Sequence, residues 1–233
     1  MKVGVTLPQF RDEADSALQA ARRAEDLGLD GVFCFDHLWP MGQPDRPALS
    51  SGPLLGALAA STSTISLGTL VARIGLLPDE VLVAVLSSLS VISTGRFIAG
   101  IGTGDHLSRP ENEAFGLPFE SAGGRRARLL TVASAVQREG VPVWLGGGGR
   151  QTVELAREVG AAVNLWDGDA RRVAELAAAG VEVTWGGTVG RTASEAMAGL
   201  TELAEAGATW AVCAWPESLE AVAEAAAEVR SVP

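Results

Sequence analysis

The sequence predicts a closed (β/α)8 barrel of parallel strands, built from a single domain over residues 1–233. Short apolar stretches alternate with amphipathic helical stretches along the chain, and four of the passages from helix to strand contain a glycine, namely Gly28, Gly160, Gly180 and Gly207. A glycine at these positions tolerates the left-handed conformation that closes a helix. Eight strands in strict alternation with helices indicate a closed barrel rather than an open sheet.

The elements follow in order from the first strand. Residues 2–7 read as this strand, and apolar residues with the helical period predict a helix over residues 12–27. Pro78 and the two acidic residues after it suit the first turn of a helix over residues 78–92. Further helices are expected over residues 124–138 and 216–229, with a long loop from the fourth strand to Ser121. The eight strands are predicted at residues 2–7, 31–35, 65–70, 96–101, 141–145, 161–165, 181–185 and 209–213.

The composition limits the partners of the chain. The formal net charge is −10, which argues against binding to nucleic-acid phosphates, and no apolar run reaches the roughly 18 residues of a membrane span. The chain enters its first strand without a cleavable signal, so we expect a cytoplasmic protein that binds neither nucleic acid nor a membrane. Cys34 and Cys213 fall inside predicted strands and are expected in the core.

Candidate catalytic residues follow the second strand. Asp36 and His37 come directly after the apolar stretch at residues 31–35, and the carboxyl ends of parallel strands face the ligand site of a barrel. The alternative is a turn in which Asp36 caps the backbone and His37 packs against Trp39. After the fourth strand, Gly102-Thr103-Gly104 leads to Asp105 and His106; glycines here would let the backbone approach a flat ligand, or would form only a tight turn.

A run of four glycines follows the fifth strand. Gly146 to Gly149 precede Arg150 at the start of a predicted helix, where exposed backbone N–H groups and the helix dipole favour a phosphate. A short connection without a ligand is the alternative. Trp39, Trp166 and Trp185 also stand at strand ends, where they would form either core packing or an apolar wall for an aromatic cofactor.

Several reaction classes lack their residues. Two histidines without a His-x-His spacing argue against a zinc hydrolase, and we expect no metal. Asp36 and Asp105 lack the aromatic surroundings of a sugar site, which argues against glycoside hydrolysis. No Gly-x-Ser-x-Gly stretch is present, so the nucleophile elbow of a serine hydrolase is missing.

The motifs together resemble one superfamily, the bacterial luciferase-like flavin monooxygenases and F420-dependent oxidoreductases. The resemblance covers the chain from its start to about residue 166, and its fold is a (β/α)8 barrel, in agreement with the strand count. It rests on residues 2–10, residues 24–30 with Phe35-Asp36-His37-Leu38, residues 65–71, 93–97, 102–104, 113–119 and 142–149.

The resemblance implies a flavin or deazaflavin across the mouth of the barrel, with its phosphate at the glycine run. In this family, a non-prolyl cis peptide often lies behind the ring, which places it at Leu70-Val71. With coenzyme F420, His37 would assist proton transfer while hydride moves to or from the ring, and Asp36 is the second catalytic residue. With FMN, His37 would act as a base beside a flavin–oxygen adduct. The Asp-His pair favours the deazaflavin branch. The implied cofactor-binding residues are Trp39, Thr69, Leu70, Val71, Gly102, Thr103, Gly104, Gly147, Gly148, Gly149 and Arg150.

One departure from the family concerns the substrate. Members usually carry a long segment before the fifth strand, whereas here Arg138-Glu139-Gly140 passes directly to Val141. A lid or substrate wall would be missing, so the small organic substrate is not identified. The expected function is an F420- or FMN-dependent oxidoreductase. The alternatives are a non-catalytic barrel that binds a flavin or phosphate ligand and a phosphate-binding isomerase. The sequence is compatible with a homodimer.

Overall fold

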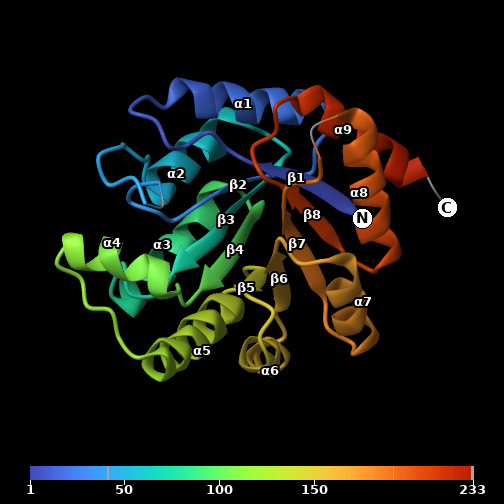
Figure 1. Cartoon of the computed structure of the whole chain (residues 1–233). Helices are drawn as coiled ribbons and strands as arrows, with labels where there is room; N and C mark the ends of the chain where they lie inside the picture. Colours follow the sequence, from blue (N-terminus) through green and yellow to red (C-terminus); the bar gives the residue numbers. More distant parts are fainter. Residues whose placement is uncertain (41, 191, 232–233) are drawn as a thin grey trace.

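Eight parallel strands form a closed barrel in the computed structural model, which describes residues 1–40, 42–190 and 192–231 (Figure 1). Each strand pairs with the next, and the last closes the barrel on the first with Lys2 opposite Trp210. The predicted fold is therefore confirmed. The strands are β1 Lys2–Thr6, β2 Gly31–Cys34, β3 Ser66–Arg73, β4 Phe97–Gly102, β5 Val143–Gly146, β6 Ala162–Trp166, β7 Val183–Gly187 and β8 Trp210–Cys213.

The helices surround the barrel (Figure 1). The helices expected at residues 12–27, 78–92, 124–138 and 216–229 are present, with ends that differ by up to three residues. The chain between β4 and Ser121, expected as a loop, also contains a 3-10 turn at His106–Ser108 and a short helix. The helices are α1 Asp15–Asp26, α2 Ser51–Ser61, α3 Asp79–Ile92, α4 Arg109–Ala114, α5 Ala122–Arg138, α6 Arg150–Val159, α7 Ala170–Ala178, α8 Ala193–Glu205 and α9 Leu219–Ser231.

β3 is longer than predicted and ends at Arg73 rather than at residue 70. Its pairing with β4 shifts register between Thr69 and Ala72, so the strand continues after an irregularity. The extension matters for the site because it carries a charged side chain to the carboxyl end of the sheet. The strand predicted from the sequence ends at residue 70, although the apolar run continues to Ala72.

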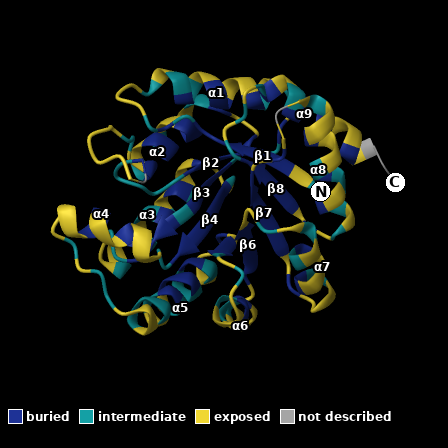
Figure 2. Ribbon diagram, viewed as in Figure 1, coloured by how far each residue is buried: buried dark blue, intermediate teal, exposed yellow. Residues whose placement is uncertain are grey.

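Burial follows the barrel plan, with buried strands inside and helices exposed on their outer faces (Figure 2). Inside the barrel, the ring of Phe33 lies 5.1 Å from that of Trp144 and 5.8 Å from that of Trp210. Gly68 makes room for this cluster, because a Cβ there would lie 2.5 Å from Phe33 Cδ1. These rings fill part of the interior, so the polar groups at the carboxyl ends of the strands stand next to a packed core.

Both cysteines are buried and free, as expected from their strands. α5 ends at Arg138 and β5 begins at Val143, so the direct connection expected from the sequence is present. Among the described residues, none of the helices combines the length and the apolar character needed to cross a bilayer.

Candidate functional site

The carboxyl ends of the strands place Asp36, Thr103 and Gly148 on one rim of the barrel, after β2, β4 and β5. Gln9, fully buried after β1, fixes the end of β2. Its side-chain amide donates to the carbonyl of Phe35 at 2.7 Å, and its Oε1 accepts from the N–H of Phe35 at 2.5 Å. The two residues that follow Phe35 are thereby held in place.

Asp36 joins three elements. Its Oδ1 accepts a hydrogen bond from the hydroxyl of Ser51 in α2 at 2.7 Å, and its Oδ2 accepts from the backbone N–H of Arg73 in β3 at 3.0 Å. Both carboxylate oxygens are therefore occupied by the protein itself. This arrangement suits a residue that positions the rim.

His37 lies against a carboxylate that the sequence reading did not select. Its Nδ1 is 3.1 Å from Oε2 of Glu111 in α4, and the His37 side chain is 23% exposed whereas that of Glu111 is 2% exposed. Backbone N–H groups also donate to Glu111 Oε1, from Leu38 and, at 3.3 Å, from Trp39. One buried carboxylate thus contacts three successive residues of the β2 loop.

Arg73 supplies the positive charge next to Glu111. Its Nη1 lies 2.7 Å from Glu111 Oε2, and its side chain is 4% exposed. Burial by itself would raise the pKa of Glu111, but the hydrogen bond with His37, the charge of Arg73 and the N–H of Leu38 outweigh it and hold that pKa below its ordinary value. Glu111 is therefore a buried carboxylate at neutral pH.

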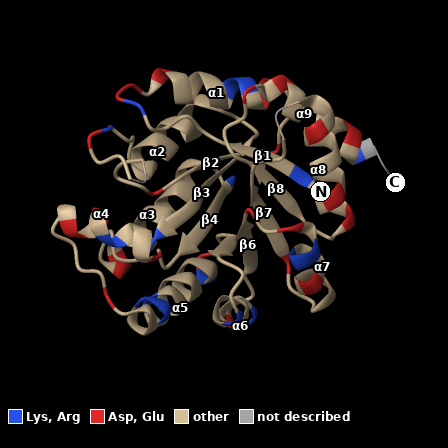
Figure 3. Cartoon of the chain, viewed as in Figure 1, with Lys and Arg blue, Asp and Glu red and all other residues tan. Residues whose placement is uncertain are grey.

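The Arg73 guanidinium retains unused donors. Within the described part of the chain, its nitrogens have no hydrogen bond of good geometry. The contact with Glu111 is therefore an ion pair in which the N–H groups do not point at the carboxylate oxygen. Gly104, at φ +66°, packs against this side chain, because a Cβ there would lie 2.7 Å from Arg73 Cδ. Charged residues occur mostly on the helices and loops (Figure 3), which makes an arginine in β3 notable.

The peptide between Leu70 and Val71 is cis, at the position that the resemblance implied. The side chain of Val71 lies against glycines of the next two strands: a Cβ on Gly102 would be 2.5 Å from Val71 Cγ2, and one on Gly146 would be 3.2 Å from Val71 Cγ1. Thr69 is buried and donates to the carbonyl of Gly100 at 2.7 Å. Thr69 is therefore engaged within the barrel wall.

Thr103, in the glycine loop after β4, is held by a side chain of α5. Its carbonyl accepts from Arg125 Nε at 2.9 Å. This contact fixes the path of the chain between β4 and α4.

The glycine run after β5 opens a helix, as expected: Gly149 is the N-cap of α6, and Gly147 has φ +106°. A Cβ on Gly148 would lie 2.4 Å from Leu165 Cδ2, so a larger residue here would displace the Leu165 side chain of β6. The carbonyl of Gly148 accepts from Arg172 Nη2 at 2.8 Å. The cation at this loop is thus Arg172 of α7.

Arg150 lies elsewhere. Its side chain is 91% exposed, and its Nε donates to Glu154 Oε1, one turn along α6, at 2.8 Å. The structure therefore directs the Arg150 guanidinium along the helix surface.

The three strand-end tryptophans have separate partners. The ring of Trp166, 45% exposed, lies 5.5 Å from that of Phe35 across the mouth of the barrel. Trp185 is buried and its indole N–H donates to the carbonyl of Gly168 at 2.6 Å. Trp39 packs on Phe115 with 5.3 Å between ring centroids. No shared indole wall forms among these residues.

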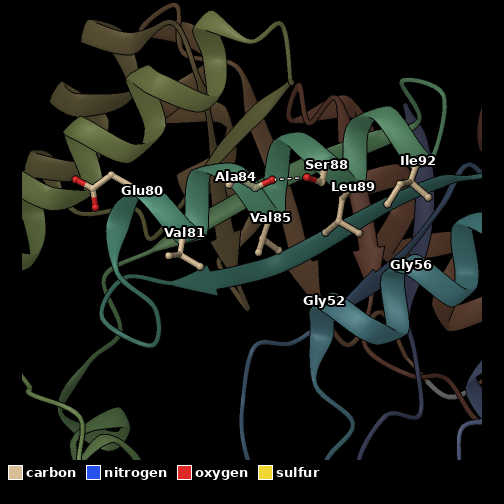
Figure 4. Close-up of a pocket in the computed structure, with 9 residues that line it drawn as sticks. All are labelled: Gly52, Gly56, Glu80, Val81, Ala84, Val85, Ser88, Leu89 and Ile92. Carbon is tan, nitrogen blue, oxygen red and sulfur yellow. Dashed lines mark hydrogen bonds between the residues drawn. The ribbon is translucent and has the colours of Figure 1, made fainter.

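Two cavities lie away from this rim. A groove of about 490 Å³ runs between α2 and α3, where Val81, Val85 and Ile92 stand beside Gly52 and Gly56 (Figure 4). A second cavity of about 360 Å³ opens at the amino ends of the strands. Its lining includes Lys2, Arg96, Glu182 and Trp210.

Sequence reasoning missed Glu111, Arg73 and Arg172. Glu111 lies two residues before the stretch at residues 113–119 that carried part of the family resemblance, and this proximity was the available signal. Arg73 directly follows the apolar run of β3 and is the last residue of that strand, so the signal was a charged residue just beyond the end of a predicted strand. Arg172 had no local signal, because its contact with Gly148 spans 24 residues.

A family model described as luciferase-like monooxygenase matches residues 1–184. An F420-dependent glucose-6-phosphate dehydrogenase from Kineococcus radiotolerans is 38% identical over 126 residues, which is 54% of this chain and 35% of that protein. An enzyme of the same description from Beutenbergia cavernae is 36% identical over 116 residues, which is 49% of this chain and 33% of that protein.

The matched part spans only about a third of the length of these two relatives. Among solved structures, an F420-dependent secondary alcohol dehydrogenase in complex with an F420-acetone adduct superposes with a TM-score of 0.79. The superposition covers 98% of this chain and 97% of that chain at 14% sequence identity. At this identity, the similarity supports the fold.

Proposed function

Because the chain belongs to the luciferase-like monooxygenase family, we propose that it is an oxidoreductase that binds coenzyme F420 at the carboxyl rim of its barrel. In this proposal, hydride moves between the cofactor and a small organic alcohol or carbonyl compound. The relatives named as F420-dependent support the choice of cofactor. The single observation that carries the proposed chemistry is the contact between His37 and the buried Glu111 at this rim.

The residues of the rim fit a flat ligand with an anionic tail. Arg73 offers buried donors that the described part of the chain leaves without an aligned acceptor. Gly149 leaves open space where a side chain would otherwise stand, and the first turn of α6 presents backbone N–H groups. We propose that the cofactor-binding set comprises Trp39, Leu70, Val71, Gly102, Thr103, Gly104, Gly147, Gly148 and Gly149, with Arg172 near the phosphate. Thr69 and Arg150 would contribute less, given their existing contacts.

Bound F420 would supply the hydride acceptor. His37 would take the proton of the substrate hydroxyl on Nε2 as the C–H hydride departs, which leaves a carbonyl product and an imidazolium. A well-placed general base contributes roughly 100- to 10,000-fold to a rate. Asp36 would hold the loop that carries His37, through Ser51 and the backbone of Arg73.

Titration of the purified protein with F420 and, separately, with FMN tests the proposal. We expect saturable binding of F420, seen in its absorption and fluorescence, and F420 reduction with at least one alcohol from a panel. A His37→Ala variant should still bind F420 but lose about 100-fold or more of the rate. His106→Ala is the matched control and should keep the rate. Binding of FMN alone, or of neither cofactor, would overturn the proposal.

A non-catalytic binding barrel is the second candidate, and the direct connection from α5 to β5 favours it. Without a longer segment there, less of the chain is available to shield the site from water. This candidate predicts that F420 binds while no alcohol or carbonyl compound changes its redox state. His37→Ala would then leave every measured property unchanged.

We also propose that two copies of the chain form a homodimer through the groove between α2 and α3. Val81, Val91 and Ile92 of α3 are exposed apolar residues at or next to this groove. Pairing would remove this apolar surface from water. The molar mass in solution, measured by light scattering, decides between one copy and two.

A further inference from the structure

Beyond the proposed oxidoreductase activity, on which it rests, we infer that Glu111 is a positioning residue that holds the neutral His37 imidazole with its proton on Nδ1. Arg73 keeps Glu111 ionised for this task. The consequence is a His37 Nε2 that can accept a proton at the rim. Glu111 thereby acts on the substrate only through His37.

The contacts fix both the place and the rotation of the imidazole. Glu111 Oε2 lies 3.1 Å from His37 Nδ1, while Oε1 of the same carboxylate accepts from the backbone N–H groups of Leu38 and Trp39. The carboxylate therefore holds the ring and the backbone that follows it as one unit. An imidazole held only by its own backbone would rotate about its side-chain bonds.

The charges determine the direction of the hydrogen bond. An ionised carboxylate only accepts, so Nδ1 must be the donor and the other ring nitrogen of a neutral imidazole is left as an acceptor. A protonated Glu111 could instead donate to Nδ1 and reverse the tautomer. Arg73 Nη1, 2.7 Å from Oε2 and 4% exposed, opposes that protonation.

In the described part of the chain, three segments place charged groups at or next to His37. Glu111 belongs to α4 and Arg73 to β3, and both are buried. Asp36 belongs to the loop after β2, and its oxygens accept from Ser51 and from the backbone of Arg73. Glu111 is therefore the carboxylate that meets the imidazole.

A purely structural role would also explain a buried glutamate, since Glu111 ties α4 to the β2 loop. The two roles differ in one observable. A tie made only through the Leu38 and Trp39 N–H groups leaves the His37 tautomer undefined, whereas a hydrogen bond with Nδ1 fixes it. The measurement must therefore report on the ring nitrogens themselves.

Nitrogen NMR of the imidazoles gives this readout without cofactor or substrate. The chain contains two histidines, so His37→Ala assigns both sets of signals and leaves His106 as the internal reference. At a pH where His37 is neutral, we expect the Nδ1–H pattern in the unmodified protein. An Nε2–H pattern or a mixture of the two tautomers would overturn the inference, and this result requires no variant at Glu111.

Glu111→Gln sharpens the test. A glutamine has one side-chain oxygen, which cannot accept both from the Leu38 and Trp39 N–H groups and from His37 Nδ1. We therefore expect the variant to lose the single Nδ1–H tautomer. Glu113→Gln, an exposed change in the same helix, is the matched control and should leave both histidines unchanged. An unchanged His37 tautomer in a folded Glu111→Gln variant would contradict the positioning role.

Kinetics separate this inference from the proposed function. If F420 binds and turns over, Glu111→Gln should lower kcat by about 10-fold or more, on the scale of a general base held poorly in place, with little change in the KM for F420. If the unmodified protein does not bind F420, the proposed function is wrong. The NMR experiment, which needs no cofactor, still decides the inference about Glu111. Equal kcat in Glu111→Gln and in the unmodified enzyme would overturn the inference.

Discussion

Glu25 of α1 carries a pH-dependent part of the stability of the barrel. Its Oε1 accepts from the N–H groups of Ser63, Thr64 and Ile65, at 2.9, 2.6 and 3.0 Å, and from the Thr64 hydroxyl at 2.9 Å. Burial raises the pKa of Glu25, but these hydrogen bonds outweigh it and lower the pKa from the ordinary 4.5 to about 2. The carboxylate thus anchors the chain that leads into β3.

Glu25→Gln removes the charge and keeps the shape. A pKa difference between 4.5 and about 2, at about 1.36 kcal/mol per pH unit, sets an upper limit of roughly 3 kcal/mol. Since the side chain is partly exposed and screened, we expect a loss of about 2 kcal/mol at pH 7. The folded pKa lies below the unfolded one, so this stability is present above about pH 4.5 and is lost as the pH falls toward 2.

Urea unfolding followed by circular dichroism at pH 7 and at pH 3 measures the effect. The free energy of unfolding of the variant should approach that of the unmodified protein at the lower pH. Asp26→Asn, at the exposed neighbouring position of the same helix, is the control and should change little at either pH. An equal difference at both pH values would refute the role of the Glu25 charge.

Two further predictions test packing. Gly148→Ala should lower the free energy of unfolding by about 1–3 kcal/mol, because its Cβ would lie 2.4 Å from Leu165 Cδ2; in urea unfolding, the double change with Leu165→Ala should cost less than the sum of the two single changes, and additive costs would contradict the contact. Burial raises the pKa of the Cys34 thiol, with a smaller contribution from Asp36, and raises that of Cys213 to about 12. Neither thiol should therefore react with a disulfide reagent in the native protein, while both react in urea; rapid native labelling would show that the strands open.

Local pattern predicted much of the fold and part of the site. The alternation of apolar strands with amphipathic helices led to the eight-strand barrel, and the glycine run led to the start of α6 at Arg150. The residues after β2 were selected because a parallel strand ends there. Local periodicity carries such information because strand and helix repeats depend on neighbours in the chain.

Contacts between distant segments supplied what pattern could not. Glu111 reaches His37 across 74 residues, and Arg172 reaches Gly148 across 24 residues. Arg150, chosen for its place beside the glycines, pairs instead with Glu154. The direction of a long side chain depends on the rotamer and on its tertiary neighbours, which sequence spacing does not specify.

The sequence by itself determined that this chain forms a barrel and which loops meet at its rim, because strand order and alternation decide which ends lie together. Only the tertiary structure decided which side chains of the rim contact one another. Asp36 connects the end of β2 to α2 and β3 through hydrogen bonds. The His37 imidazole contacts the buried carboxylate of Glu111, which is paired with Arg73. The pairing of His37 depends on the short helix α4, which brings Glu111 against the β2 loop. Burial of the Glu111 charge is tolerated because the opposite charge of Arg73 lies next to it.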